Sequence, residues 1–207
     1  MVMDDFYTNP DMIRQKALSM AYSEPENFTG WRTRAYHPKG IKERIEHTFR
    51  IRIKYWEEGL NEIEIGNGVF FLSHSSGPCA EAVCIHYDHP ANWATLLIYF
   101  TPNAPLDAGT SIWRHRETGL ISKPTKRDVE RLGISIQRLS EILEKDQSNP
   151  RRWREIDRVG NVYNRAVMFP AGLFHSATRH FGNSKAQGRI YQSFHFSLQR
   201  FQVGCSD

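Results

Sequence analysis

The sequence predicts a mainly β fold with flanking helices, and three observations support this prediction. Short segments rich in β-branched and aromatic residues recur between Pro and Gly turns, which is typical of a sandwich or barrel. Helical spacing of apolar residues is confined to the N-terminal part and to residues 123–158. At 207 residues, of which 12% are aromatic and 24% charged, the chain is expected to form one globular domain with its own core.

Residues 1–58 predict helical and loop structure that supports this core. Asn9 followed by Pro10 predicts an N-cap and the first residue of a helix, and apolar residues at helical spacing follow. The Pro, Gly and Asn content of residues 24–40 predicts a loop, and residues 41–55 predict a second helix.

Residues 59–113 and 162–200 are expected to form the β core. The predicted strands are residues 62–65, 69–72, 80–86, 93–100, 109–113, 162–169, 173–176 and 189–198. Gly66-Asn67-Gly68 predicts a hairpin turn between the first two. Residues 117–158 predict a helical insertion, which either serves as a lid over a site or covers hydrophobic surface.

Charge and cysteine content exclude several classes of protein. The formal net charge of +4 arises in residues 114–158, which contain 12 Lys and Arg residues and 8 Asp and Glu residues. Because that segment has no block of like charges, we expect a solvated helical face or attraction of small acidic ligands, and no nucleic-acid partner. Cys79, Cys84 and Cys205 form no C-x-x-C pair and are expected to be buried thiols. The start has no secretory pattern and no apolar run could span a membrane, so we expect a cytoplasmic protein.

His86-Tyr87-Asp88 is the most informative motif. On a strand, alternate residues share one face and lie roughly 6.6 Å apart, so His86 and Asp88 can converge on one metal ion while Tyr87 points away. The motif follows an apolar run, and polar side chains at the end of a buried strand are costly unless something binds them. Two His and one carboxylate on one side of an ion form the facial triad of non-haem Fe(II) oxygenases.

The third ligand and a carboxylate-binding residue are expected further along the chain. His175 is the preferred third ligand because it begins a strand after a Pro-Ala-Gly turn, with His180 and His195 as alternatives. Arg189 begins the last long strand and shares its polar face with Tyr191, Ser193 and His195, as on a strand that lines a pocket. Its guanidinium can bind a carboxylate through two hydrogen bonds.

Taken together, these residues resemble the Fe(II)/2-oxoglutarate-dependent oxygenases, and in particular their bacterial prolyl-hydroxylase-like members. The resemblance rests on His86-x-Asp88, His175 and Arg189, together with residues 94–100 and 109–113, and it spans most of the chain. It implies a double-stranded β-helix (a jelly-roll, cupin-like core) in a single oxygenase domain over residues 1–207. The His-x-His of cupins is missing.

The resemblance also implies roles for individual residues. His86, Asp88 and His175 would hold Fe(II), and Arg189 would bind the distal carboxylate of 2-oxoglutarate, assisted by Tyr191 and Ser193. Tyr99 and Thr110 are further candidate contacts to this cosubstrate. With O2, the reaction would convert 2-oxoglutarate to succinate and CO2 while a C–H bond is oxidised, by hydroxylation as the default and with desaturation or ring closure as alternatives.

The substrate is expected to be a small amino-acid-like molecule or natural-product intermediate. Trp113 and the run Arg114-His115-Arg116 predict contacts to a carboxylate of that substrate. Two other classes stay open, namely a non-catalytic 2-oxoglutarate-binding sensor or scaffold and a divalent-metal hydrolase. The sequence does not determine the oligomeric state.

Overall fold

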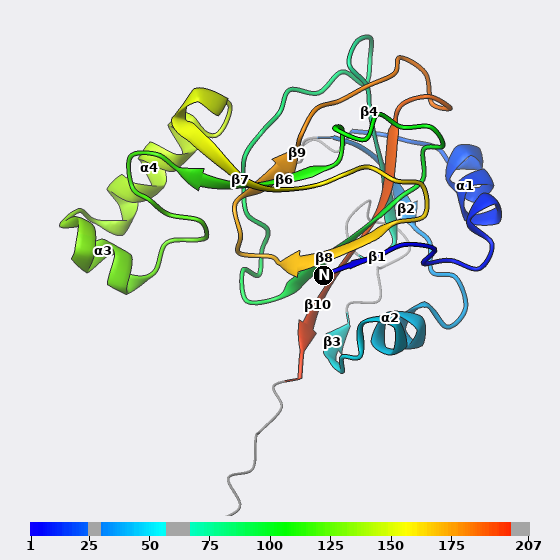
Figure 1. Cartoon of the computed structure of the whole chain (residues 1–207), viewed down its shortest axis with the longest axis horizontal. Coiled ribbons are helices and arrows are strands. Elements are labelled where there is room, and N and C mark those ends of the chain that lie inside the picture. The colour runs from blue at the N-terminus through cyan, green and yellow to red at the C-terminus, as the bar shows by residue number, and fades with distance from the viewer. Residues whose placement is uncertain (25–29, 57–66, 200–207) are drawn as a thin grey trace, which may run out of the picture.

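Two antiparallel sheets face each other in the computed structural model, which describes residues 1–24, 30–56 and 67–199 (Figure 1). The larger sheet has the order β1-β8-β5-β10-β4-β2, with β3 paired to β10, and the smaller sheet has the order β7-β6-β9. The strands are β1 (Val2–Met3), β2 (Trp31–Ala35), β3 (Ile53–Trp56), β4 (Val69–Ser73), β5 (Ala94–Tyr99), β6 (Thr110–His115), β7 (Trp153–Val159), β8 (Ala166–Pro170), β9 (His175–Ala177) and β10 (Arg189–Leu198). This mainly β, jelly-roll-like arrangement confirms the predicted fold class.

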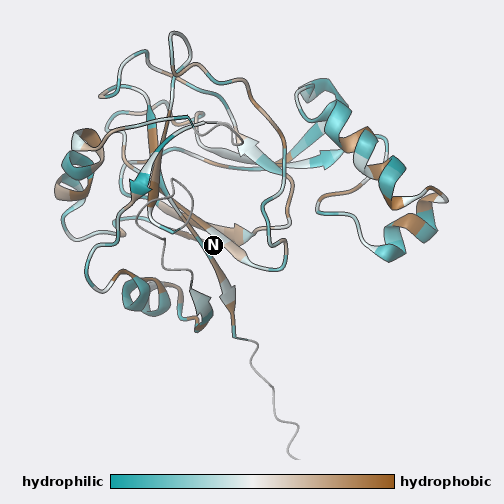
Figure 2. Cartoon of the chain, turned by 180° about the vertical axis from the view of Figure 1, so that it is seen from behind, coloured by the Kyte–Doolittle hydropathy of each residue, from teal (hydrophilic) through white to brown (hydrophobic). Residues whose placement is uncertain are grey.

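The central strand β5 is buried on both faces. Leu96 and Ile98 point into a core shared with the helices α1 (Pro10–Ser19) and α2 (Ile41–Phe49). Leu97 and Tyr99 point the other way, into a smaller cluster on the side of the second sheet. The central strands are accordingly brown in Figure 2, which marks hydrophobic residues. The large sheet is therefore a wall with helices on one side and a space between the sheets on the other.

The two N-terminal helices begin and end for local reasons. Asn9 Oδ1 accepts a hydrogen bond from Met12 N at 3.2 Å and Pro10 is the first residue of α1, as predicted. Helix α2 ends earlier than expected, because Arg50 adopts a left-handed conformation with φ 52°. The chain then forms β3 in place of the predicted second half of the helix.

The predicted insertion contains the helices α3 (Lys126–Leu132) and α4 (Ile136–Asp146), which lie beyond the end of the small sheet where β6 ends and β7 begins (Figure 1). Buried Leu139 and Leu143 of α4 pack in a cluster with Ile85, Trp153 and Phe174. The helix thus covers hydrophobic surface, which was one of the two expected roles. A short 3-10 turn (Pro150–Arg152) leads from there into β7.

Two further strands lie where the sequence predicted other structure. The helical prediction for residues 153–158 is wrong, because β7 pairs antiparallel with β6, with one shift in register. Most of its residues are exposed and many are charged, so its sequence lacks the apolar alternation of a buried strand. Likewise, β2 lies in the predicted loop and is held by pairing with β4.

The prediction of a strand over residues 80–86 is also wrong. These residues are exposed or half-buried except for Ile85, and pairing is limited to isolated bridges at Ala80 and His86. The strands predicted at 162–169 and 173–176 exist but begin later, at Ala166 and His175. The strand predicted at 62–65 and Gly66 of the predicted hairpin turn lie outside the described residues.

Gly109, just before β6, allows two chain segments to meet. A Cβ added there would lie 1.9 Å from the carbonyl oxygen of Val159, although Gly109 has no positive φ. We therefore expect Gly109→Ala to lower the free energy of unfolding by about 3 kcal/mol or more. Urea denaturation followed by circular dichroism measures this loss.

Gly77→Ala is the matched comparison, because Gly77 has φ +84° but nothing within 4 Å of an added Cβ. It should cost about 1 kcal/mol through backbone conformation alone. Equal losses in the two variants would contradict a steric role for Gly109.

Candidate metal centre

A cavity of about 560 Å³ lies on the inner face of the large sheet. Residues from both sheets and from the segment 81–89 line it: Arg32, Val69, Phe71, Glu81, Ala82, Cys84, His86, Asp88, His89, Thr95, Leu97, Thr110, Gln147, His175, Ser176, Ala177, His180, Arg189, Tyr191, Ser193 and His195. This volume is within the range of roughly 300–1,000 Å³ typical of small-molecule sites.

His86, Asp88 and His175 meet in this cavity. His86 N donates to His175 O at 3.0 Å and His175 N donates to His86 O at 2.8 Å, so the two residues form an isolated antiparallel bridge. Their ring centroids are 4.6 Å apart. One ligand atom from each of the three residues lies within 4.8 Å of the other two.

The two imidazole rings are oriented by backbone carbonyl groups. Nδ1 of His86 lies 3.0 Å from the carbonyl oxygen of Cys84, and Nδ1 of His175 lies 2.9 Å from that of Leu173. A carbonyl oxygen only accepts, so each Nδ1 carries the proton and each Nε2 is left with a lone pair in the neutral ring. A backbone carbonyl on the far nitrogen is the usual support of a metal-ligating His.

The spacing of these donor atoms fits a metal ion. Nε2 of His86 is 3.5 Å from Asp88 Oδ1, and Nε2 of His175 is 3.4 Å from Asp88 Oδ2. Ligands about 2.1 Å from an ion and at right angles to one another lie about 3 Å apart. All three side chains face the cavity, so the opposite side of such an ion would be open to a small molecule.

The electrostatics of the three side chains are strongly coupled. Burial raises the pKa of Asp88, but the imidazoles of His175, His86 and His195 hold it well below its ordinary value, so the carboxylate is ionised. Burial lowers the pKa of His175 to about 4 despite the Asp88 charge. Desolvation also lowers the pKa of His86, but hydrogen bonds to Asp88 and Cys84 outweigh it and raise the value to about 10. Binding of a metal ion at His86 Nε2 therefore competes with binding of a proton.

Asp88 is held by a chain of polar groups. Thr95 Oγ1 donates to Asp88 Oδ2 at 2.6 Å and lies 3.2 Å from His195 Nδ1. His195 Nε2 in turn lies 3.0 Å from Ser193 Oγ. The backbone N of Asp88 donates to Ala171 O at 2.8 Å. The carboxylate therefore has a fixed orientation in which Oδ1 lies on the side of His86.

Arg189 lies in the same cavity, on the face of β10 that the alternation predicted. It is 3% exposed, and it donates to the carbonyl oxygens of Ala108 and Gly109 at 3.3 and 3.2 Å. Its guanidinium carbon lies 4.5 Å from the ring centroid of Tyr191 and 5.5 Å from that of Tyr99. The head group is thus held between two aromatic rings.

The other predicted cosubstrate residues lie around Arg189. Tyr191, Ser193 and Thr110 line the cavity, whereas Tyr99 is fully buried behind it. The Tyr99 hydroxyl lies 2.6 Å from Thr110 Oγ1. Tyr99 therefore orients Thr110 and does not line the cavity itself.

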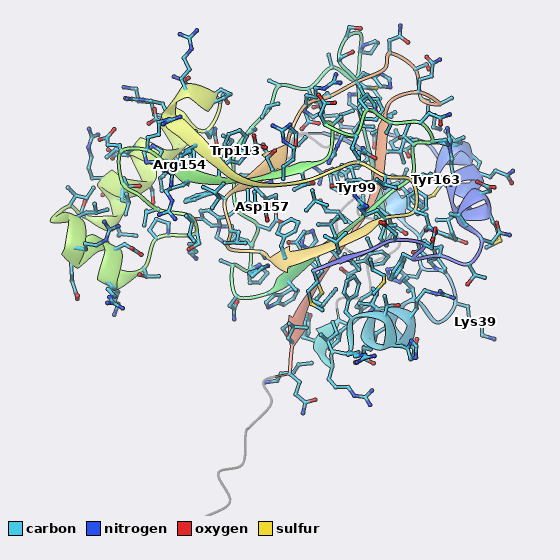
Figure 3. All side chains as sticks on the ribbon, in the orientation of Figure 1. Lys39, Tyr99, Trp113, Arg154, Asp157 and Tyr163 are labelled. Atoms are coloured by element: carbon cyan, nitrogen blue, oxygen red, sulfur yellow. The ribbon has the colours of Figure 1, made fainter. Side chains whose placement is uncertain are left out.

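The predicted substrate contacts of Trp113, Arg114, His115 and Arg116 need correction, because none of these side chains lines the cavity. His115 is fully buried, with Nε2 3.0 Å from Asp146 Oδ2. Arg114 donates to Gly119 O and Arg116 to Trp153 O. Trp113 lies toward α4, away from Tyr99 (Figure 3), and donates to Ser176 Oγ at 2.9 Å. Residues 113–116 lie at the end of β6 that is remote from the cavity. The sequence alone does not show this distance, because it depends on how the strands pair.

The sequence predicted the position of one further residue near the triad correctly and missed three others. Tyr87 packs against Phe174, away from the triad, as the alternation predicted. The sequence did not predict the contact of Thr95 with Asp88. Its alternation with Leu97 and Tyr99 on one face of β5 could have indicated a polar residue that faces the cavity. Arg32 and Glu81 also line the cavity, and no local pattern indicated them.

The three cysteines remain without an indicated role. Cys79 and Cys84 are free and half-buried, so they are less buried than predicted, and Cys84 lines the cavity. Cys205 lies outside the described residues.

Comparisons with known proteins agree with this fold. The model of a family described as "Family of unknown function (DUF6445)" matches residues 1–192. No curated protein matches the sequence. Among solved structures, the chain is similar to the crystal structure of HygX from Streptomyces hygroscopicus with nickel and 2-oxoglutarate bound.

That similarity has a TM-score of 0.55 at 9% sequence identity and covers 95% of this chain and 82% of the HygX chain. At this identity the match supports the fold alone. Within the described residues, none of the helices has the length and apolar composition needed to cross a membrane.

The Thr95 hydroxyl should be needed for tight metal binding, because it orients Asp88. We expect Thr95→Val to weaken the binding of Co(II) about 10- to 100-fold, whereas Thr95→Ser, which keeps the hydroxyl, should bind nearly as tightly as the wild type. Anaerobic titration followed by absorbance measures these affinities.

Thr33→Val is the matched control, since Thr33 is a fully buried threonine that bonds to backbone groups of β2 and β4. Unchanged Co(II) affinity in Thr95→Val would show that Asp88 needs no such support.

Proposed function

The chain belongs to the DUF6445 family of unknown function, and we propose that it is a non-haem Fe(II)/2-oxoglutarate-dependent oxygenase that hydroxylates a C–H bond of a small molecule. One observation carries the proposal. A triad of His86, Asp88 and His175, with both Nε2 atoms oriented as ligands, shares a cavity with a buried arginine at the start of β10.

The donor set favours iron over the metals of hydrolytic sites. Two imidazoles and one carboxylate with an open side are typical of non-haem Fe(II) oxygenases. When bound there, Fe(II) supplies the activation of O2, coupled to the decarboxylation of 2-oxoglutarate to succinate and CO2. One oxygen atom of O2 enters succinate and the other enters the hydroxylated product, so the overall reaction is balanced.

The residues of this chain have three tasks in that reaction. Arg189 binds the distal carboxylate of 2-oxoglutarate, because its guanidinium is buried, held between two rings and matched to a carboxylate. Thr110, Tyr191 and Ser193 add polar groups around the same end of the cavity. Leu97 and Val69 provide apolar wall that limits the access of water.

The similarity to HygX supports the proposal indirectly. HygX was crystallised with nickel and 2-oxoglutarate bound, and its fold is similar to that of this chain. The size of the cavity favours a small substrate of amino-acid or natural-product type over a folded protein.

Metal- and 2-oxoglutarate-dependent formation of succinate is the first expected result. With Fe(II) under air, the protein should convert 2-oxoglutarate to succinate slowly even without its substrate, and Asp88→Ala or His175→Ala should abolish this because each removes a ligand. His47→Ala, which changes an exposed histidine of α2, should leave the rate unchanged. Succinate is quantified by mass spectrometry.

The same preparation discriminates the two other classes. A sensor or scaffold would bind 2-oxoglutarate without forming succinate. A hydrolase would act on ester or phosphate substrates with Zn(II) and no requirement for 2-oxoglutarate. Either result would contradict the oxygenase.

Arg189 should control the affinity for 2-oxoglutarate. Removing a buried charge that pairs with a carboxylate costs several kcal/mol, so Arg189→Ala should raise the KM for 2-oxoglutarate by roughly 100-fold. Arg189→Lys should recover only part of the loss, because an ammonium cannot form the two-point contact.

Arg179→Ala is the control, since Arg179 is an exposed arginine that pairs with Asp107. If Arg189→Ala left KM within about twofold of the wild type, the distal carboxylate would be bound elsewhere.

A further inference from the structure

One histidine of the cavity has no role in the proposed function. His180 lies in the segment between β9 and β10, is half-buried and lines the cavity. The sequence indicated it as an alternative third metal ligand. Within the described residues, however, the group of candidate ligands consists of His86, Asp88 and His175. The position of His180 in the cavity therefore needs another explanation.

Strand pairing places His180 at the end of the cavity that contains Arg189. Ser73, the last residue of β4, is the cross-strand partner of Arg189, the first residue of β10. Residues directly opposite each other on two antiparallel strands point to the same face, with Cβ atoms about 5 Å apart. Ser73 Oγ lies 2.7 Å from His180 Nδ1, so the imidazole ring is attached to the direct neighbour of Arg189.

Ser73 also orients the imidazole ring. Its side chain is buried, and its hydroxyl group can either donate to Nδ1 of His180 or accept from it. When Ser73 donates to Nδ1, the single proton of the neutral ring is on Nε2. Within the described part of the chain, this Nε2 forms no hydrogen bond with another group. The ring therefore has one donor available for a ligand in the cavity.

The protonation state of the ring suits a neutral donor. Burial lowers the pKa of His180 to about 4, and the charge of Arg189 contributes to this shift. The ring is therefore uncharged near pH 7. A neutral N–H group can bind a carboxylate beside Arg189 without placing a second positive charge next to the guanidinium.

Arg189 and a carboxylate both have hydrogen-bonding capacity to spare. A guanidinium has five N–H donors. Those of Nε and Nη2 donate to the carbonyl oxygens of Ala108 and Gly109, which leaves others for a ligand. A carboxylate has about four acceptor positions, so a two-point contact with one arginine leaves room for a further donor. His180 lies where such a donor is needed.

We infer that His180 is a second residue that binds the distal carboxylate of 2-oxoglutarate, donating from Nε2 while Ser73 donates to its Nδ1. This inference rests on the proposed function, since it assumes that Arg189 binds the same carboxylate. A 2-oxo acid without a distal carboxylate would lose the contacts of both residues. His180 thereby helps to determine which 2-oxo acid serves as cosubstrate.

The test compares two acids that differ only at the distal end. 2-Oxopentanoate has the chain length and the 2-oxo acid group of 2-oxoglutarate, with a methyl group in place of the distal carboxylate. Both are titrated anaerobically into the full chain loaded with Co(II), and binding is followed by absorbance. We expect His180→Phe to weaken the binding of 2-oxoglutarate roughly 10- to 100-fold, the effect of one hydrogen bond to a charged group. The affinity for 2-oxopentanoate should change less than about twofold.

Further variants separate a direct contact from a structural effect. His180→Gln should recover part of the loss, because its carboxamide has N–H donors within reach of the position of Nε2. Ser73→Ala should weaken the binding of 2-oxoglutarate in the same selective way but less, because the ring stays and only its orientation is lost. His47→Phe, which changes an exposed histidine of α2, is the control and should bind both acids as the wild type does.

The possible failures are distinguishable. The inference is wrong if His180→Phe weakens both acids equally, since the ring would then support the cavity as a whole. It is also wrong if the affinity for 2-oxoglutarate stays within about twofold of the wild type. In either case, succinate formation by the wild type with Fe(II) would leave the oxygenase intact. Absence of any binding of 2-oxoglutarate to the wild type overturns both proposals together.

Discussion

The candidate site depends on one backbone interaction, the reciprocal pair of hydrogen bonds between His86 and His175. The segment that carries His86 and Asp88 is not part of either sheet, so pairing with neighbouring strands does not fix it. The bridge attaches this segment to β9 and brings two imidazole rings together at a point where each has a carbonyl oxygen behind its Nδ1. The fold therefore already holds the three side chains in an arrangement that suits a metal ion. This lowers the free-energy cost of organising them when an ion binds.

The same segment is supported from the other side by the helical insertion. Ile85 N donates to the carbonyl oxygen of Gln147, the residue that follows α4, and Ile85 packs in the cluster formed by α4 and the small sheet. Gln147 also lines the cavity. The insertion therefore does two things at once: it covers apolar surface and it holds the residue next to His86. The hydrogen bond from Ile85 to Gln147 is therefore a direct connection between the end of the insertion and the segment that carries His86 and Asp88.

Strand alternation organises the rest of the cavity. β10 directs Ile190 and Phe194 into the main core and Arg189, Tyr191 and Ser193 into the space between the sheets. The polar face is tolerated in a buried strand because its groups have partners: Arg189 donates to two carbonyl groups and stacks between rings, and Ser193 contacts His195. A charged end near Arg189 and a second charged region at Arg32 and Glu81 are separated by Phe71 and Tyr191.

The sequence by itself determined the mainly β fold, the start of α1 and the alternation along β10, because strand and cap patterns are local. It also indicated His86, Asp88, His175 and Arg189 as a set, because the chemistry of a residue type does not depend on its context. Only the tertiary structure decided which distant residues share a space. β7 and β2 are edge strands whose exposed, charged residues carry no strand signal until a partner pairs with them. Arg114 and Arg116 looked suitable for binding a carboxylate but lie at the wrong end of β6, whereas Arg32, in a segment predicted as a loop, enters the cavity. Charge and residue type can be read from the sequence, but proximity is created by strand pairing between segments far apart in the chain. The end of the cavity near Arg32 consists of such segments.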